Sequence, residues 1–172
     1  MLALVPLTAL ADRYEEGKHY EVVTQKLSVK PEVREYFSFY CPACFNFEPL
    51  MQDIKKDLPA GVKFEKNHVD FMRGASEKVQ GMLTKAMILA ELLGQDDKLN
   101  GPIFNYIHRQ RAVFTSEKDI RNLFVLNGVD GEKFDKLIKS FSLNSKHKQL
   151  KKKQEDLART GKLNSVPTII VN

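Results

Sequence analysis

The chain has 172 residues, 42% of them hydrophobic, and a formal net charge of +5 at pH 7. That length suits one domain with room for an insert, and the apolar content is enough to build a core. No stretch after residue 11 approaches the ~18 apolar residues of a membrane-spanning helix, which excludes such a span there. The two cysteines form a single Cys-x-x-Cys and the four histidines are scattered, which disfavours a four-ligand structural zinc site.

The N-terminal segment, residues 1–11, is apolar and uncharged, and Ala9-Leu10-Ala11 is a small-x-small cleavage pattern. With the polar residues that follow, it predicts the tail of a cleavable secretory signal peptide, although a basic n-region is absent. A short buried strand is the alternative. An oxidising compartment agrees with a chain whose only cysteines form a close pair.

Two strand-like segments come next. Residues 20–27 alternate and predict a first strand, and residues 33–39 are of β type and predict a second. Glu35 lies among the inward Val, Tyr and Phe residues of the second strand. Because a buried carboxylate is costly unless it is paired or protonated, Glu35 is either a functional acid or an edge-strand residue facing water.

The second strand leads into Cys41-Pro42-Ala43-Cys44, and apolar residues at helical spacing follow. This pattern predicts a strand-to-helix turn, with Cys41 at the helix N-terminus and Pro42 in the first turn, where no N–H donor is needed. Unpaired N–H groups and the helix dipole should favour a Cys41 thiolate, which makes Cys41 the exposed attacking sulfur. Cys44, about one turn further on the same side, can close a disulfide and should be shielded from solvent.

The helix after Cys44 should end near Pro59, and residues 62–69 predict a third strand with Lys66 on the same face as Phe64. From residue 74 to about residue 160 the apolar period is helical. The predicted inward faces run from Val79 to Leu93 before Gly94, from Leu99 to Ile107 with Pro102 in the first turn, from Ile120 to Phe124 after a capping box at Ser116–Asp119, from Phe134 to Phe141, and from Leu143 to Leu157.

The last of these helices carries a cluster of lysines: Lys146, Lys148, Lys151, Lys152 and Lys153. With the net positive charge, they raise the question of nucleic acid. No aromatic residues are interleaved with them, and two acidic residues follow directly. The pattern favours a solvated helix face over a site for an anionic partner.

Val166-Pro167 precedes the β-type run Thr168–Val171, which predicts a fourth strand. The residue before a proline is pushed toward extended geometry, and a proline at a strand start can be cis at modest cost.

These segments together resemble the DsbA family, the thioredoxin-fold thiol oxidases of the bacterial periplasm. The most specific element is the CxxC pair followed at this distance by Val-Pro-Thr before a β run. The matching segments are Glu35 to Cys44, Leu58-Pro59, Gly61 to Lys63, His68 to Met72 and Ser165 to Thr168. The resemblance implies an α/β, thioredoxin-like fold with a helical insertion between the third and fourth strands. Because such a domain should continue beyond Asn172, we expect a fragment that lacks the last strand and the C-terminal helix, with reduced stability and a tendency to aggregate.

The resemblance also implies roles for individual residues. Glu35 is similar to the buried acid below the cysteines, which tunes the pair and assists proton transfer. Lys66 is similar to a lysine that pairs with this acid, although an ordinary surface lysine is the alternative. Pro167 would be cis and pack against the cysteines, and Val166 and Pro167 would offer backbone to a substrate strand.

Pro42 and Ala43 are further expected substrate contacts. Ala43 departs from the best-known DsbA motif, which has histidine at this position. A histidine can stabilise the Cys41 thiolate by charge and hydrogen bonding, and alanine can do neither. The reduced state should therefore be less favoured in this chain.

We thus predict a periplasmic, monomeric thiol:disulfide oxidoreductase that donates the Cys41–Cys44 disulfide to newly exported proteins. By the resemblance, a membrane-embedded, quinone-linked partner of the DsbB type would reoxidise it. We expect no metal or other cofactor and no nucleic-acid partner. The alternatives are a weaker oxidant, a thioredoxin-like reductant, a dithiol metal-binding module and a non-catalytic peptide-binding domain. The predicted units are residues 1–11 as a signal-peptide remnant, 12–73 with 161–172 as the thioredoxin-like domain, and 74–160 as the helical insertion.

Overall fold

A computed structural model describes residues 14–23 and 29–172 of the chain. Its elements in chain order are β1 (Glu32–Phe37), α1 (Pro42–Asp57), β2 (Lys63–His68), α2 (Glu77–Leu92), α3 (Asp96–His108), α4 (Glu117–Leu126), α5 (Gly131–Ile138), α6 (Phe141–Arg159) and β3 (Thr168–Val171). The mixed α/β class with helices between β2 and β3 confirms the predicted fold class.

The sheet has the strand order β2-β1-β3. β1 pairs with β2 in parallel, with Glu35 opposite Lys66, and with β3 in antiparallel, with Glu35 opposite Ile169. Glu35 therefore lies in the central strand of the described sheet, which contradicts the edge-strand alternative. The predicted signal-peptide segment and residues 24–27 of the predicted first strand lie outside the described residues, and residues 20–23 make only an isolated bridge from Tyr20 to Glu16.

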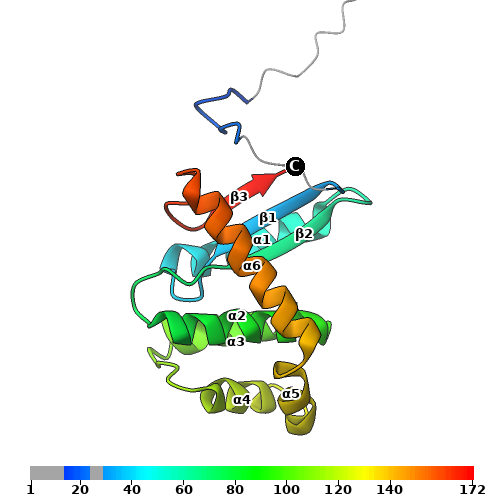
Figure 1. Ribbon diagram of the computed structural model, residues 1–172, viewed down its shortest axis with the longest axis vertical. Helices are drawn as coiled ribbons and strands as arrows, with labels where there is room; N and C mark the ends of the chain where they lie inside the picture. Colours follow the sequence, from blue (N-terminus) through cyan, green and yellow to red (C-terminus); the bar gives the residue numbers. More distant parts are fainter. Residues whose placement is uncertain (1–13, 24–28) are drawn as a thin grey trace, which may run out of the picture.

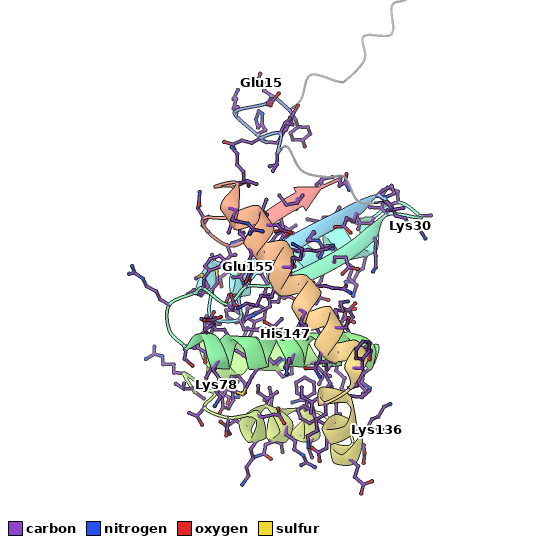
Figure 2. All side chains as sticks on the ribbon, in the orientation of Figure 1. Glu15, Lys30, Lys78, Lys136, His147 and Glu155 are labelled. Atoms are coloured by element: carbon purple, nitrogen blue, oxygen red, sulfur yellow. The ribbon has the colours of Figure 1, made fainter. Side chains whose placement is uncertain are left out.

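The helices form two groups around the sheet (Figure 1). In the view of Figure 1, α1 lies behind the strands and α6 crosses in front of them, while α2 to α5 lie together below the sheet. Figure 2 shows side chains filling the space between α2, α4 and α5. α6 begins in this helical group and ends beside β3, so that it connects the two parts of the molecule.

One buried cluster runs from the sheet into the helical group. It contains Phe37 and Phe39, both cysteines, and apolar residues of α2 to α6. Phe104 of α3 lies at its centre, with its ring centroid 4.9 Å from that of Phe39 and 6.0 Å from that of Phe37. The cysteines therefore belong to the main core and are not mounted on a peripheral loop.

Most predicted helix ends are confirmed by their caps. Ser116 and Asp119 form the capping box of α4, and Gly94 follows α2 with a φ of 64°, a left-handed value that glycine adopts without strain. Pro102, however, was expected in a first helical turn and lies inside α3, because that helix already begins at Asp96. The prediction was wrong because it took the first apolar residue for the start of the helix.

Phe141 was also misplaced. It was expected to face inward at the end of the fourth helix, but α5 ends at Ile138 and Phe141 is the first residue of α6 with 89% of its surface exposed. The Ser140 side chain accepts a hydrogen bond from the N–H of Leu143, which starts a new helix and changes the face that Phe141 occupies.

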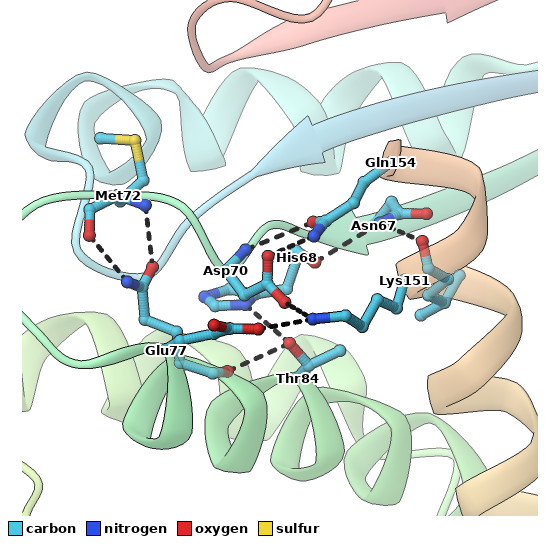
Figure 3. Close-up of polar contacts among 10 residues, drawn as sticks. Asn67, His68, Asp70, Met72, Glu77, Thr84, Lys151 and Gln154 are labelled. Atoms are coloured by element: carbon cyan, nitrogen blue, oxygen red, sulfur yellow. Dashed lines mark hydrogen bonds and ion pairs between the residues drawn. The ribbon is translucent and has the colours of Figure 1, made fainter. Parts of the chain in front are cut away.

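The prediction of a solvated lysine face on α6 holds only in part. Lys148 and Lys152 are exposed. Lys151, in contrast, bonds Asp70 after β2 at 2.9 Å and Glu77 of α2 at 2.6 Å, and Lys146 pairs with Glu91 of α2 (Figure 3 shows the Lys151 contacts). These lysines tie α6 to the neighbouring elements, which a one-dimensional charge pattern does not reveal.

Candidate active site

The cysteines lie where β1 gives way to α1. β1 ends at Phe37, and Cys41 is the N-cap of α1, in extended backbone geometry with φ −94° and ψ 113°. Pro42 occupies the first helical position, where the missing N–H costs nothing. The backbone N–H of Cys44 donates to the Sγ atom of Cys41 at 3.1 Å, so the helix N-terminus stabilises negative charge on this sulfur. The predicted position of the pair is confirmed.

The predicted exposure of Cys41 is wrong. Only 3% of its surface is exposed, against 0% for Cys44, because the core cluster and the loop at Val166 enclose it. The two thiols differ in their electrostatics more than in their exposure. Burial raises the pKa of Cys44, the neighbouring Cys41 adds to this effect, and a backbone hydrogen bond from Ser38 opposes it. Cys44 therefore resists ionisation, while Cys41 holds the hydrogen bond that a thiolate needs.

The loop before β3 faces this sulfur. The peptide bond between Val166 and Pro167 is cis, as predicted, and the carbonyl oxygen of Val166 lies 3.4 Å from the Sγ atom of Cys41, which donates to it. Residues 125 positions apart thus meet at the reactive atom. Pro42 and Ala43 lie on the outer side of the turn and are exposed, while Val166 and Pro167 are half-buried.

Glu35 is fully buried and forms an ion pair with Lys66 across the two parallel strands, with 2.8 Å between Oε2 and Nζ. Burial raises the pKa of Glu35, and Lys66 only partly offsets the rise. For Lys66, burial alone lowers the pKa, but the charges of Glu35 and Glu48 outweigh it and hold the pKa above its usual value. The alternative of an ordinary surface lysine is therefore wrong.

Glu48 is a member of this charge group that the sequence reasoning missed. Its Oε2 atom accepts a hydrogen bond from Lys66 at 2.6 Å, and its Oε1 atom accepts one from Gln52 at 3.1 Å. The signal was available, because Glu48 follows Cys44 by four residues and shares its helix face with Cys44 and Met51. Lys66 therefore serves two carboxylates, one below the cysteines and one on α1.

The described part of the chain contains no group of three or more His, Cys, Asp or Glu residues able to hold a metal ion. Within the same residues, no helix combines the length and the apolar character needed to cross a membrane.

Comparisons with known proteins agree with this geometry. A model of the DSBA-like thioredoxin domain matches residues 32–172. The chain is 37% identical to the thiol:disulfide interchange protein DsbA of Escherichia coli over an alignment of 172 positions. This alignment covers 98% of this chain and 79% of the relative. The DsbA of Haemophilus influenzae is 38% identical over the same shares.

Among solved structures, the chain is similar to DsbA from Proteus mirabilis with a non-covalently bound peptide PWATCDS. The sequences are 30% identical, the TM-score is 0.79, and the similarity covers 92% of this chain and 82% of that one. A crystal structure of Pseudomonas aeruginosa DsbA gives a TM-score of 0.76 at 28% identity, over 94% of this chain and 82% of that one. With a reactive Cys-x-x-Cys at a helix N-terminus beside a cis-proline loop, the chain belongs to the DSBA-like thioredoxin domain family and is a thiol:disulfide oxidoreductase.

Proposed function

We propose that this enzyme oxidises cysteine-containing proteins newly exported to the bacterial periplasm, by donating the disulfide between Cys41 and Cys44. The observation that carries the proposal is the 3.1 Å hydrogen bond from the Cys44 N–H to the Cys41 Sγ atom at the start of α1. A sulfur whose thiolate is stabilised is a good leaving group, and stabilising the reduced pair makes a dithiol more oxidising.

The exchange proceeds in two steps. A substrate thiolate attacks Cys41 Sγ, the Cys41–Cys44 bond breaks, and its electron pair goes to Cys44. A second substrate thiolate then attacks the substrate sulfur of the mixed disulfide and releases the Cys41 thiolate. Two electrons pass from the substrate to the enzyme, the substrate gains a disulfide, and the enzyme retains a dithiol.

Glu35 and Lys66 are proposed to manage the proton of this exchange. Cys44 leaves as a thiolate with a raised pKa and therefore requires a proton. Burial raises the pKa of Glu35, which favours the protonated carboxyl form that can supply one. Lys66, 2.8 Å from Glu35, limits how far that pKa rises and keeps the acid able to exchange its proton.

The substrate is proposed to bind as an extended segment along Val166 and Pro167, with Pro42 and Ala43 exposed beside it. The Val166 carbonyl oxygen, 3.4 Å from Cys41 Sγ, lies where a backbone hydrogen bond would place a substrate cysteine against that sulfur. The peptide bound to the Proteus mirabilis DsbA supports a peptide-binding role for this family.

The proposal extends to the setting of the reaction. A DsbB-type, quinone-linked membrane partner would reoxidise the dithiol, and the protein would act as a monomer after cleavage of a signal peptide within residues 1–11. We further propose that residues 12–73 and 161–172 form one unit and that residues 74–160 form an inserted helical unit. Five helices, α2 to α6, lie between β2 and β3, in support of that division.

Ala43 supports a second candidate, a weaker oxidant or a reductant. Alanine adds neither charge nor a side-chain hydrogen bond to the Cys41 sulfur, so the thiolate depends on the backbone alone. Equilibration of the protein with glutathione buffers distinguishes the two, because a strong oxidant remains reduced at glutathione ratios at which a reductant becomes oxidised.

The exchange mechanism is tested by Cys44→Ser and Cys41→Ser. When Cys41 of Cys44→Ser is first converted to its mixed disulfide with glutathione, we expect thiolates of reduced, unfolded substrate proteins to displace the glutathione and stay attached, because no resolving thiol remains. Cys41→Ser, treated in the same way, should attach few substrate molecules and lose oxidase activity. Non-reducing electrophoresis and peptide mapping identify the attached cysteine. More substrate attached to Cys44 in Cys41→Ser than to Cys41 in Cys44→Ser would contradict the assignment.

A further inference from the structure

His68, the last residue of β2, is a buried histidine outside the exchange mechanism. Only 2% of its surface is exposed, and its ring stacks on that of Phe39 with centroids 5.1 Å apart. Its Nδ1 atom lies 2.9 Å from the hydroxyl of Thr84 on α2, and its Nε2 atom lies 3.4 Å from the hydroxyl of Ser38 (Figure 3 shows the Thr84 contact). The imidazole thus joins α2 to the segment between β1 and Cys41.

The hydrogen bonds that link Thr84, His68 and Ser38 have only one consistent direction. Thr84 donates its single hydroxyl proton to the carbonyl oxygen of Gln80 at 3.1 Å, so toward His68 it can only accept. The Nδ1 atom of His68 therefore carries the proton. Burial, aided by the nearby His147 and opposed by Asp70, lowers the pKa of His68 to about 3, so the ring is neutral and Nε2 accepts the proton of Ser38.

Ser38 in turn contacts the backbone around both cysteines. Its hydroxyl oxygen accepts the N–H of Tyr40 at 3.2 Å, and its carbonyl oxygen accepts the N–H of Cys41 at 3.0 Å. A backbone hydrogen bond from Ser38 also reaches the thiol of Cys44. Any rotation of Ser38 therefore moves the start of α1 and the surroundings of both sulfurs.

We propose that His68 is a positioning residue for thiol–disulfide exchange, which holds Ser38, and through it the turn at Cys41, in register with α2. The Nε2 atom of the imidazole accepts from the hydroxyl of Ser38, and its Nδ1–H group donates to the hydroxyl of Thr84. When the chain of hydrogen bonds is intact, the Cys44 N–H stays directed at the Cys41 sulfur. When it is broken at its far end, this alignment loosens and the thiolate is less stabilised.

Thr84→Val tests the proposal from the end that touches neither cysteine. Valine matches threonine in shape but leaves the Nδ1 proton of His68 without its acceptor, and Thr84→Ser restores the hydroxyl. We expect imidazole nitrogen NMR shifts to show a changed tautomer population in Thr84→Val. Alkylation of Cys41 at slightly acidic pH should slow by roughly two- to tenfold, the range that the loss of one net hydrogen bond spans.

The same variant should shift the equilibrium with glutathione toward the disulfide form by a similar factor, and Thr84→Ser should recover both values. Ile138→Val, a core change on α5, is the control for lost stability alone and should leave alkylation and equilibrium unchanged. If Thr84→Val keeps the alkylation profile and the glutathione equilibrium of the wild type, the proposal is overturned.

Should Thr84→Val not fold, Ser38→Ala provides the same test, because it removes the hydroxyl and keeps the backbone contacts with both cysteines. An unchanged alkylation profile in Ser38→Ala would equally overturn the proposal. A slowed profile in Ser38→Ala supports it.

Discussion

The charge group beneath the cysteines gives the sharpest test of the electrostatics. The Nζ atom of Lys66 lies 2.8 Å from Glu35 and 2.6 Å from Glu48, and the Glu35 side chain is fully buried. Two unit charges at the first distance attract by ~6 kcal/mol at an effective dielectric constant of about 20. Among the neighbouring charges, Lys66 has the largest effect in holding the pKa of Glu35 down against burial.

Lys66→Met removes this attraction, so the pKa of Glu35, already raised by burial, should rise further and the carboxyl should stay protonated to higher pH. The pKa of Glu35 in the folded state, already above that in the unfolded chain, would then lie further above it. The folded state would hold a proton that the unfolded chain releases, and the free energy of unfolding would fall as pH rises. The limiting slope is ~1.4 kcal/mol per pH unit, and removal of Lys66 extends to higher pH the range over which this slope applies.

Urea denaturation at several pH values, with reductant present to keep both thiols reduced, measures this slope. The double variant Lys66→Met/Glu35→Gln is the matched control, because it lacks the carboxyl and should lose the added pH dependence. In both variants Glu48 keeps its hydrogen bond from Gln52. A slope in Lys66→Met equal to that of the wild type would show that Lys66 does not hold down the Glu35 pKa, and the reasoning would be refuted.

Two further predictions concern Ala43 and Phe104. Ala43→His adds donors beside the Cys41 sulfur at the helix N-terminus, so the reduced form should gain stability and the protein should become a stronger oxidant, by ~30 mV for each ~1.4 kcal/mol gained. Equilibration with glutathione measures the potential, and a lower potential would contradict the electrostatic account. Phe104→Ala should lower the free energy of unfolding by ~3–5 kcal/mol, because this fully buried ring packs against the rings of Phe37 and Phe39. Leu126→Ala, at a residue 84% exposed, should change it by less than about 0.5 kcal/mol, and equal urea midpoints for the two variants would rule out a central role for Phe104 in the core.

Local sequence signals were enough to predict where Cys41 and Cys44 lie in the fold. A β run, a proline after Cys41 and helical spacing after Cys44 place the turn without knowledge of the rest, because each is a property of a few adjacent residues. Contacts between distant residues, such as that of Val166 with Cys41, came from the resemblance, because 125 positions separate these residues and local signals do not connect them.

Side-chain contacts between different helices and strands could not be predicted in the same way. Helical spacing shows that Lys151 lies on an outer face of α6, but it does not show that Asp70 and Glu77 approach that face. Likewise, the sequence shows a histidine at position 68 without the hydroxyls of Ser38 and Thr84 on either side of it. Burial of Cys41 was missed for the same reason, because the residues that cover it come from other parts of the chain.

The course of α6 has a mechanical consequence for the substrate contact. This helix of 19 residues is ~28 Å long; it is anchored near its start by Leu143 in the main core and near its end by Leu157 beside the sheet. Val166, whose carbonyl faces the Cys41 sulfur, follows shortly after that end. Between Leu143 and Leu157, Leu150 also lies in the main core, so α6 is held along its length. The position of the Val166 carbonyl beside the reactive sulfur thus depends on how the whole of α6 packs, and not only on the residues next to the cysteines.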